Sequence, residues 1–322
     1  MHTIIISKEH GKDVCDMRDA YCETLLDLAE KDPRIVAADA DLMTAMGLKP
    51  FAAKYPDRTV DCGVQEANMI GVACGLAVQG KIPFAHTFAP FCTRRACDQI
   101  FLSGAYNHAN VKVVGSDPGI TAAYNGGTHM PFEDMGIMRG VPTMTVIEPT
   151  DVVMLKNILP KIAQTEGMFY MRLVRKSVRK VYDEGSDFEI GKAVLLREGS
   201  DVTIIASGYT VAEALSAADI LKEEGVDARV INIFTWKPID EDAIVQAAGE
   251  TGAIVTAENH NVLSGLGCAV SEVLSLKIPT PMEMVGVQDE FGEVGPEDYL
   301  RERFGLTDAK IVEAVHKVLL RK

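Results

Sequence analysis

Three stretches of the chain combine charged or aromatic side chains with glycine in patterns that suit catalysis. In the first, Glu66 stands just before an apolar helix of small residues in DCGVQEANMIGVACGLA. In the second, Phe88 and Phe91 are three residues apart in TFAPFCTRRACDQ, and in the third His129 lies in the polar loop SDPGITAAYNGGTHMPFED. Each stretch also has a structural interpretation, because a carboxylate favours a helix N-terminus, paired aromatics usually belong to a core, and a loop histidine is often simply hydrogen-bonded.

Strand-like and helical segments alternate along the whole chain. Short runs rich in β-branched residues predict strands at 35–40, 111–116, 143–148, 168–174, 201–207, 227–233 and 253–258. Amphipathic patterns between them predict helices, such as 14–31, and Thr210 with Glu213 has the spacing of a capping box. This alternation predicts an α/β fold in which mainly parallel sheets are covered by helices on both faces. Ligands of such sheets bind beyond the carboxyl ends of the strands, where the loop with His129 would lie.

The length of 322 residues is enough for about two domains. A polar, charged stretch without apolar periodicity predicts that a first domain, 1–180, is joined by a linker, 181–190, to a second domain, 191–322. We interpret the preceding basic run as part of a solvated linker rather than as a polyanion site. That run consists of Arg172, Arg175, Lys176, Arg179 and Lys180.

The composition argues against several classes of partner. The formal net charge of −14 disfavours nucleic acid and anionic membranes. The seven cysteines include no CxxC pair, which indicates reduced thiols and no metal site. No apolar segment approaches the ~20 residues that cross a bilayer, and no signal peptide is evident, so the cytoplasm is the expected compartment.

Taken in order, the three stretches resemble one family over essentially the whole chain: the C-terminal half of transketolase, a thiamine-diphosphate enzyme. The resemblance rests on GVQEANMIGVACGLA, GKIPFAHTFAPF, GGTHMPFEDMGIMRGVPTMTVIEPTD, DARVINI, KPID and AIVTAENHNVLSGLGCAVSEVL. It implies a pyrimidine-binding domain followed by a transketolase C-terminal domain.

The resemblance also implies which residues hold the cofactor. Glu66 matches a glutamate that shares a proton with a ring nitrogen of the aminopyrimidine, which requires an apolar pocket that disfavours the ionised carboxylate. Phe91 matches the aromatic residue stacked on the pyrimidine ring, with Phe88 beside it. Asp41, in DADL, matches an aspartate at the cofactor site.

On the substrate side, His129 matches the histidine that hydrogen-bonds the hydroxyl end of the donor sugar. Arg18, in MRDAY, and Arg175, in MRLVRK, match the arginines that bind the sugar phosphate, with Arg172 as a neighbouring second choice. Asp117 is retained from the family pattern.

Several substrate-side residues depart from that pattern. Asn125 stands where the family has an aspartate that reads a sugar hydroxyl, Ser116 replaces a phosphate-contacting histidine, and Met130 replaces a glutamine. We therefore predict transfer of a two-carbon ketol unit between sugars or sugar phosphates, with an atypical sugar that is branched, sulfonated or phosphorylated in an unusual place.

The expected cofactors are thiamine diphosphate and magnesium. The Gly-Asp-Gly motif that introduces the diphosphate and metal site of full-length transketolases does not occur in the sequence. The resemblance therefore implies a separate N-terminal-half chain that binds most of the magnesium and diphosphate, most simply with two copies of each chain.

Two alternative functions remain open: the β subunit of a 2-oxo-acid dehydrogenase, which also depends on a separate chain, and a non-catalytic regulatory subunit. A nicotinamide site at Gly265-Leu-Gly267 is disfavoured because the third glycine of the fingerprint is missing, so we interpret these glycines as strand–helix packing. We expect His260 to be structural and the C-terminal domain mainly to support the dimer.

Overall fold

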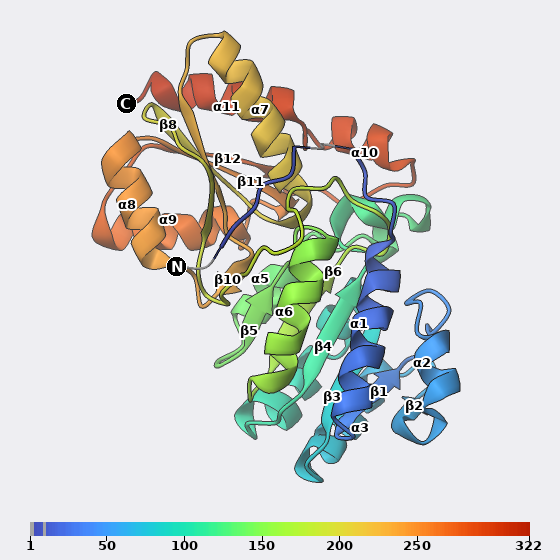
Figure 1. Ribbon diagram of the computed structural model, residues 1–322. Helices are drawn as coiled ribbons and strands as arrows, with labels where there is room; N and C mark the ends of the chain where they lie inside the picture. The colour runs from blue at the N-terminus through green and yellow to red at the C-terminus, as the bar shows by residue number, and fades with distance from the viewer. Residues whose placement is uncertain (1–2, 9–10) are drawn as a thin grey trace.

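The computed structural model describes residues 3–8 and 11–322 and contains two sheets with helices on both faces (Figure 1). The first sheet has the strand order β10-β5-β6-β4-β3-β1-β2, in which only β10 is antiparallel to its neighbour. Its strands are β1 (Ile35–Asp39), β2 (Thr59–Asp61), β3 (Ile82–Phe88), β4 (Lys112–Ser116), β5 (Thr145–Ile147), β6 (Phe169–Leu173) and β10 (Thr235–Lys237).

The second sheet has the order β12-β11-β8-β9-β7, and its edge strand β7 is antiparallel to β9. Its strands are β7 (Val194–Arg197), β8 (Val202–Ala206), β9 (Ala228–Asn232), β11 (Ile254–Asn261) and β12 (Met282–Val287). Two successive, mainly parallel sheets confirm the predicted α/β fold.

The helices form the outer layers. Those that contribute most to the two large cores are α1 (Met17–Lys31), α3 (Glu66–Val78), α5 (Asp134–Arg139), α6 (Val152–Gln164), α7 (Val211–Glu223), α8 (Glu241–Thr251), α9 (Leu266–Lys277) and α11 (Asp308–Leu319). Shorter helices are α2 (Lys49–Lys54), α4 (Cys97–Gln99) and α10 (Glu297–Arg303). In the part of the chain that the structure describes, no helix is long and apolar enough to cross a membrane.

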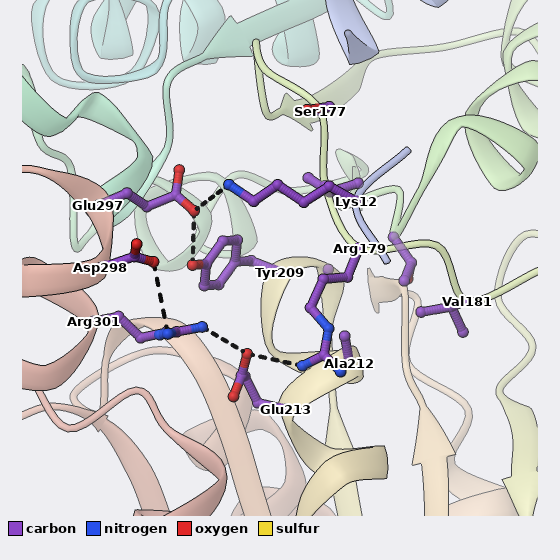
Figure 2. A pocket seen from close by; sticks show the side chains of 13 residues that line it. Lys12, Ser177, Arg179, Val181, Tyr209, Ala212, Glu213, Glu297, Asp298 and Arg301 are labelled. Carbon is purple, nitrogen blue, oxygen red and sulfur yellow. Dashed lines mark hydrogen bonds and ion pairs between the residues drawn. The ribbon is translucent and has the colours of Figure 1, made fainter. Parts of the chain in front are cut away.

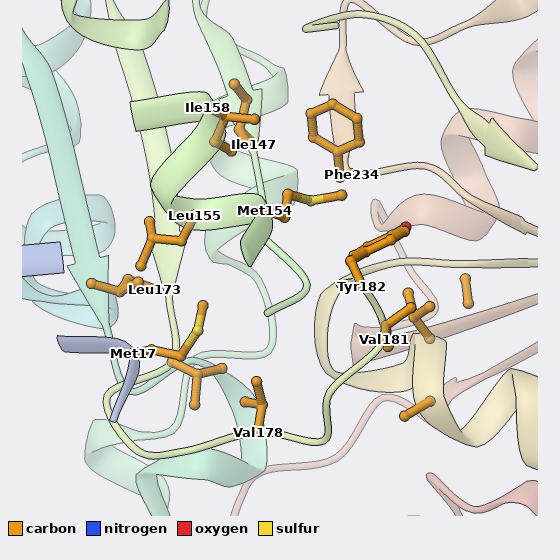
Figure 3. Packing of buried hydrophobic residues seen from close by; sticks show 14 of the residues in the cluster. Met17, Ile147, Met154, Leu155, Ile158, Leu173, Val178, Val181, Tyr182 and Phe234 are labelled. Atoms are coloured by element: carbon orange, nitrogen blue, oxygen red, sulfur yellow. The ribbon is translucent and has the colours of Figure 1, made fainter. Parts of the chain in front are cut away.

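Each large core extends over one face of both sheets. One contains buried residues of α1, α6, α7 and α11, and the other contains buried residues of α3, α5, α8 and α9. Successive residues of a strand alternate between them, so that Ala37 packs in the first core and Ala38 in the second. Figure 3 shows how Met154 and Leu155 of α6 share the first core with Tyr182 and Phe234, which come from outside the first sheet.

The connector between the two sheets is packed rather than solvated. Val181, Tyr182 and Phe188 are each at most 1 % exposed, and Ile6 pairs with Tyr182 in an isolated β-bridge. In addition, β10 follows β9 in sequence but hydrogen-bonds to β5 of the first sheet. The prediction that this linker is solvated is therefore wrong. The domain boundaries at 180 and 191 stay a prediction.

Ion pairs join the two halves around a cavity of only about 30 Å³, roughly the volume of one water molecule (Figure 2). Glu213 of α7 accepts hydrogen bonds from Arg179 of the connector and from Arg301 of α10, both at 3.2 Å. The hydroxyl of Thr210 donates to the carbonyls of Ser207 and Ala257. The predicted capping box is therefore wrong, because both of its side chains are used in tertiary contacts.

A second set of buried charges centres on Arg172, which is fully buried on β6. Its Nε lies 2.9 Å from Asp134 Oδ2 and its Nη1 lies 3.0 Å from Glu148 Oε1. Ser207, which follows β8 of the second sheet, donates to the other oxygen of Glu148. The suggestion that Arg172 is a second-choice phosphate ligand is therefore wrong, because its guanidinium is enclosed in structural ion pairs.

Replacing Arg172 by Met should leave two buried carboxyl groups without their cation. We expect the free energy of unfolding to fall by about 3–5 kcal/mol, the usual effect of removing one partner of a buried ion pair. The exposed pair of Arg34 and Asp32 provides the control, because Arg34→Met should change stability by less than about 1 kcal/mol. Urea unfolding of both variants measures the difference, and equal effects would contradict the structural role of Arg172.

Glu258 lies on β11, and its side chain caps the N-terminus of α9. Its carboxylate accepts hydrogen bonds from the backbone N–H groups of Leu266 (2.6 Å) and Gly267 (2.9 Å), and a Cβ at Gly265 would collide with it. The glycines thus serve close strand–helix packing, as expected. Burial raises the pKa of Glu258 to about 8.

His260, also fully buried, accepts a hydrogen bond at Nε2 from the N–H of Gly136, so its role here is structural.

The raised pKa of Glu258 makes stability depend on pH. Its folded-state pKa lies above the ordinary value of 4.5, so its contribution to stability is complete below pH 4.5 and is lost as the pH rises toward 8. The Tm of the wild type relative to Glu258→Gln should therefore decrease between pH 5 and pH 8. Differential scanning fluorimetry measures this difference, and a Tm gap that stays constant with pH would refute the assignment.

Candidate functional site

The candidate residues lie along the carboxyl edge of the first sheet. Strands β1, β3, β4 and β6 are parallel, and each lies beside the next in the sheet order, so their C-terminal ends meet at one edge. Asp41 follows β1, Phe88 ends β3, Asp117 follows β4 and Arg175 follows β6. Residues that are 134 positions apart in sequence are thereby brought to the same side of the molecule.

Glu66 is the first residue of α3 and is 1 % exposed. Its two carboxylate oxygens lie 2.9 and 2.7 Å from Nη1 of Arg95, so the buried acid is ion-paired. The sequence predicted an apolar pocket around Glu66 and did not predict this cation. The available signal was weak: Arg95 lies one helical turn after Phe91, in a segment that reads as a basic surface helix.

Arg95 and Phe91 belong to a π-helical segment, η2 (Phe91–Arg95). Such wide turns are uncommon and occur often at functional sites. The guanidinium carbon of Arg95 lies 4.4 Å from the ring centroid of Phe91, in a cation–π contact. One arginine therefore contacts both the candidate acid and the candidate stacking residue.

Three rings form the next part of the site. The centroid of His129 lies 5.1 Å from that of Phe91 and 5.8 Å from that of Phe88, and the two phenylalanines are 6.1 Å apart. Phe88 is buried, whereas Phe91 and His129 are partly exposed. The group thus presents an aromatic surface that a planar ligand can reach.

Asp117 is the centre of the charged part of the site and is 1 % exposed. Nη2 of Arg175 lies 3.1 Å from its carboxylate, and the hydroxyl of Ser116 donates to it at 3.0 Å. Burial raises the pKa of Asp117, although the nearby charge of Arg175 opposes the shift. The N–H of Arg18 donates to the carbonyl of Arg175 at 3.2 Å, so the two arginines are neighbours.

Both arginines have a buried side-chain N–H group that makes no hydrogen bond to the described residues. The Nε atoms of Arg18 and Arg175 have no hydrogen-bond partner among the described residues, although the carboxylates of Asp16 and Asp19 lie 3.6 Å from the Arg18 guanidinium. A buried guanidinium N–H without a partner is unfavourable, and an oxyanion would satisfy it. The two side chains therefore fit an anionic group of a ligand.

Two predicted residues lie at the margin of this group. Asp41 is exposed with a φ of +64°, and its N–H donates to Asp61. Asn125 is exposed and lies on the same loop as His129. Asp39, just before Asp41, is buried and was not anticipated; burial raises its pKa to about 7.

The residues fit one part of thiamine diphosphate. A buried carboxyl beside an accessible aromatic surface suits the aminopyrimidine ring. Within residues 3–8 and 11–322, no group of three His, Cys, Asp or Glu side chains is arranged to hold a metal ion. The residues of this site suit the pyrimidine end of the cofactor.

Comparisons with known proteins agree with this interpretation. The family model of the transketolase pyrimidine-binding domain matches residues 13–180, and that of the transketolase C-terminal domain matches residues 191–311. The chain is 55 % identical to the 6-deoxy-6-sulfo-D-fructose transketolase subunit of Clostridium sp. (strain MSTE9), over 95 % of each chain. It is 38 % identical to an apulose-4-phosphate transketolase subunit of Phocaeicola vulgatus, over 85 % of this chain and 88 % of that protein.

A solved structure described as a split-gene transketolase, in the form of an inactive beta4 tetramer, has a TM-score of 0.88 to this chain. The two are 43 % identical in sequence, and the match covers 95 % of this chain and 98 % of the other. The family models cover both sheets, and the relatives match over nearly their full lengths. The chain belongs to the transketolase family and contains its pyrimidine-binding and C-terminal domains.

Proposed function

We propose that this chain is the C-terminal subunit of a thiamine-diphosphate-dependent transketolase, which transfers a two-carbon ketol unit between sugars once an N-terminal-half chain completes the site. The observation that carries the proposal is the run of contacts from Glu66 through Arg95 and Phe91 to His129. A decayed, regulatory half-site would have no reason to keep these contacts together.

Thiamine diphosphate, when bound, supplies the nucleophilic carbon that takes up and releases the ketol unit. Glu66 would act as the carboxylate acceptor that shares the proton of the ring nitrogen of the aminopyrimidine, and its burial keeps water out of that contact. The ion pair with Arg95 fixes the direction of the carboxyl group. Phe91, with Phe88 beside it, would support the plane of the ring.

The loop after β4 would bind the sugar. His129 would donate or accept a hydrogen bond at a sugar hydroxyl, and the hydroxyl of Thr128, 2.9 Å from its Nδ1, fixes the plane of the ring. Asn125 offers an amide donor and acceptor on the same loop. Asp117, held by Arg175 and Ser116, would accept from a hydroxyl or orient the arginines.

The anionic end of the sugar would lie at Arg18 and Arg175. Arg175 is paired with Asp117, and Arg18 lies 3.6 Å from both Asp16 and Asp19, so carboxylates already offset much of the positive charge here. A sulfonate is a monoanion, whereas a phosphate ester carries about −1.5 to −2 at pH 7. A site whose cations are partly offset suits the less charged sulfonate, and the relative that is 55 % identical is named for 6-deoxy-6-sulfo-D-fructose.

The assembly would require a second kind of chain. Relatives of similar length are named as transketolase subunits, and the similar solved structure, built of one kind of chain, is described as inactive. We therefore propose that a separate N-terminal-half chain supplies the magnesium and diphosphate ligands, in an assembly with two copies of each chain. The seven free cysteines suit a reducing compartment, so we place the enzyme in the cytoplasm.

Ketol transfer by the co-purified two-chain complex tests this function. With thiamine diphosphate and magnesium, the complex should be active only when both chains are present, with the highest kcat/KM for 6-deoxy-6-sulfo-D-fructose in a panel with fructose 6-phosphate and xylulose 5-phosphate. Glu66→Gln should lower kcat by about 10²–10⁴-fold, because a positioned proton-transfer group is lost.

The matched control for that variant is Glu258→Gln, which alters another buried glutamate, on β11, whose side chain hydrogen-bonds a helix N-terminus. It should leave kcat within about twofold of the wild type, because additivity and coupling fall off for distant groups. Full activity of Glu66→Gln, or activity of this chain alone, would contradict the proposal.

Anion binding at Arg18 and Arg175 is testable without the partner. Methanesulfonate at ten times its Kd should stabilise the wild-type chain by about 1.4 kcal/mol. The gain should disappear in Arg18→Met and Arg175→Met, which lack one of the two donors. Arg34→Met is the control, because Arg34 is paired with Asp32 just before β1, at the edge of the sheet opposite to the site. Thermal unfolding measures the shift, and equal shifts in all variants would indicate a general salt effect instead.

A further inference from the structure

The loop that carries the proposed sugar ligands packs on the second half of the chain. Its apolar residues form a third, separate core with residues from the C-terminal part of the second sheet and from α10 and its flanks. The members of this core are Ile120, Ala122, Met130, Phe132, Val287, Leu300, Phe304 and Leu306. The rings of Phe132 and Phe304 meet edge to face at 5.2 Å. The loop thus follows a strand of the first sheet in sequence but packs against residues of the second half of the chain.

Asn259 hydrogen-bonds to the backbone at the start of this loop. It lies on β11, is fully buried, and accepts a hydrogen bond at Oδ1 from the N–H of Ile120 at 3.0 Å. Its Nδ2 donates to the carbonyl of Pro118 at 3.2 Å. Pro118 directly follows Asp117, so the amide of Asn259 holds the backbone next to the residue that binds Arg175.

The same strand holds the end of the loop. The N–H of Asn261 donates to the carbonyl of Phe132 at 2.8 Å. Between these two anchors the backbone is strained, because Ala123 adopts φ 47° and ψ −115°. A non-glycine residue keeps such a conformation only where the surroundings impose it, which here means the contacts with the second half.

The tip of the loop is held as well. A Cβ at Gly127 would collide with the carbonyl of Gly292, and a Cβ at Gly292 would lie 2.5 Å from the sulfur of Met130. Gly127 and Met130 stand on either side of His129. Gly292 is therefore packed directly against the backbone that carries this histidine.

We propose that Asn259 is a positioning residue for substrate recognition: it holds the loop 117–132 so that Asp117 and His129 meet the sugar in a fixed geometry. The C-terminal half then sets sugar affinity, in addition to any role in assembly. This inference rests on the proposed function, because it takes the loop to be the sugar-binding element. Displacing binding groups by about 1 Å can cost up to 10²-fold in rate, so loss of the anchor should be measurable.

Asn232 offers a matched control. It is also a fully buried asparagine of the second sheet, and its Nδ2 donates across the halves to Thr150 and to Tyr182, both at 2.8 Å. It contacts the connector side rather than the loop. Asn259→Ala and Asn232→Ala should therefore lose similar stability, while only the first releases the loop 117–132.

The experiment compares both variants in the full chain and in the two-chain complex. Hydrogen–deuterium exchange of peptides covering 119–130 should rise in Asn259→Ala and stay at the wild-type level in Asn232→Ala. In the complex, Asn259→Ala should raise the KM for the sugar donor at least about tenfold, with little change in kcat or in the thiamine diphosphate requirement. Asn232→Ala should leave KM within about twofold.

Unchanged exchange at 119–130 in Asn259→Ala, or the same increase in both variants, would overturn the inference. The inference would also be overturned if exchange at 119–130 increased in Asn259→Ala while the KM for the sugar donor stayed unaltered in an active complex. If Asn259→Ala does not fold, Gly292→Ala takes its place, because it acts on the tip of the loop from an outer segment and should raise KM in the same way. A wild-type complex that is inactive on every sugar would reject the proposed function, and the exchange data would still decide whether Asn259 anchors the loop.

Discussion

Parallel strands that lie side by side must all end at the same edge of their sheet, and the loops that follow them are thereby brought together. Here this constraint acts on four neighbouring strands, β1, β3, β4 and β6. The residues after each strand differ in chemistry: carboxylates after β1, aromatic rings after β3, a polar loop with a histidine after β4 and an arginine after β6. The site exists because the sheet order aligns these four ends, and each loop can vary without disturbing the sheet.

The second half of the chain restrains what the first half presents. Buried ion pairs of Arg172 and Glu148 reach Ser207 at the end of β8, and β10 extends the first sheet from within the second half. The loop with His129 is enclosed from the same direction. A rigid interface of this kind limits the freedom of a polar, glycine-rich loop and gives it a defined geometry before any ligand binds.

Much of this organisation could be predicted from the sequence. The predicted strands correspond to β1, β4, β5, β6, β8, β9 and β11, because their apolar, β-branched runs are buried on both faces. Strands β2 and β10 were missed since each is three residues long and, unlike β5, was not part of a longer apolar run that we recognised; β3 was missed because IPFAHTF contains a proline and a histidine. Strands β7 and β12 were missed as well. The resemblance to transketolase identified the family correctly on its ordered motifs.

What could not be predicted depends on distant partners. Arg172 stands in a basic run that reads as solvated, and only the fold brings Asp134 and Glu148 to it. The pairing of Glu66 with Arg95 likewise requires α3 and the π-helical segment to meet. Apolar residues can be predicted to be buried from the local sequence. Whether a charged residue is buried depends on whether the tertiary structure places an opposite charge beside it.

The central claim is that this chain forms one part of a thiamine diphosphate site that a second chain completes. Calorimetric titration with thiamine diphosphate and magnesium tests it most directly, with this chain alone, the N-terminal-half chain alone and their mixture. We predict saturable binding at one cofactor per pair of chains in the mixture and a much weaker signal from either chain by itself. Equally tight binding by one chain alone, or no binding by a mixture that has formed a complex, would contradict the account.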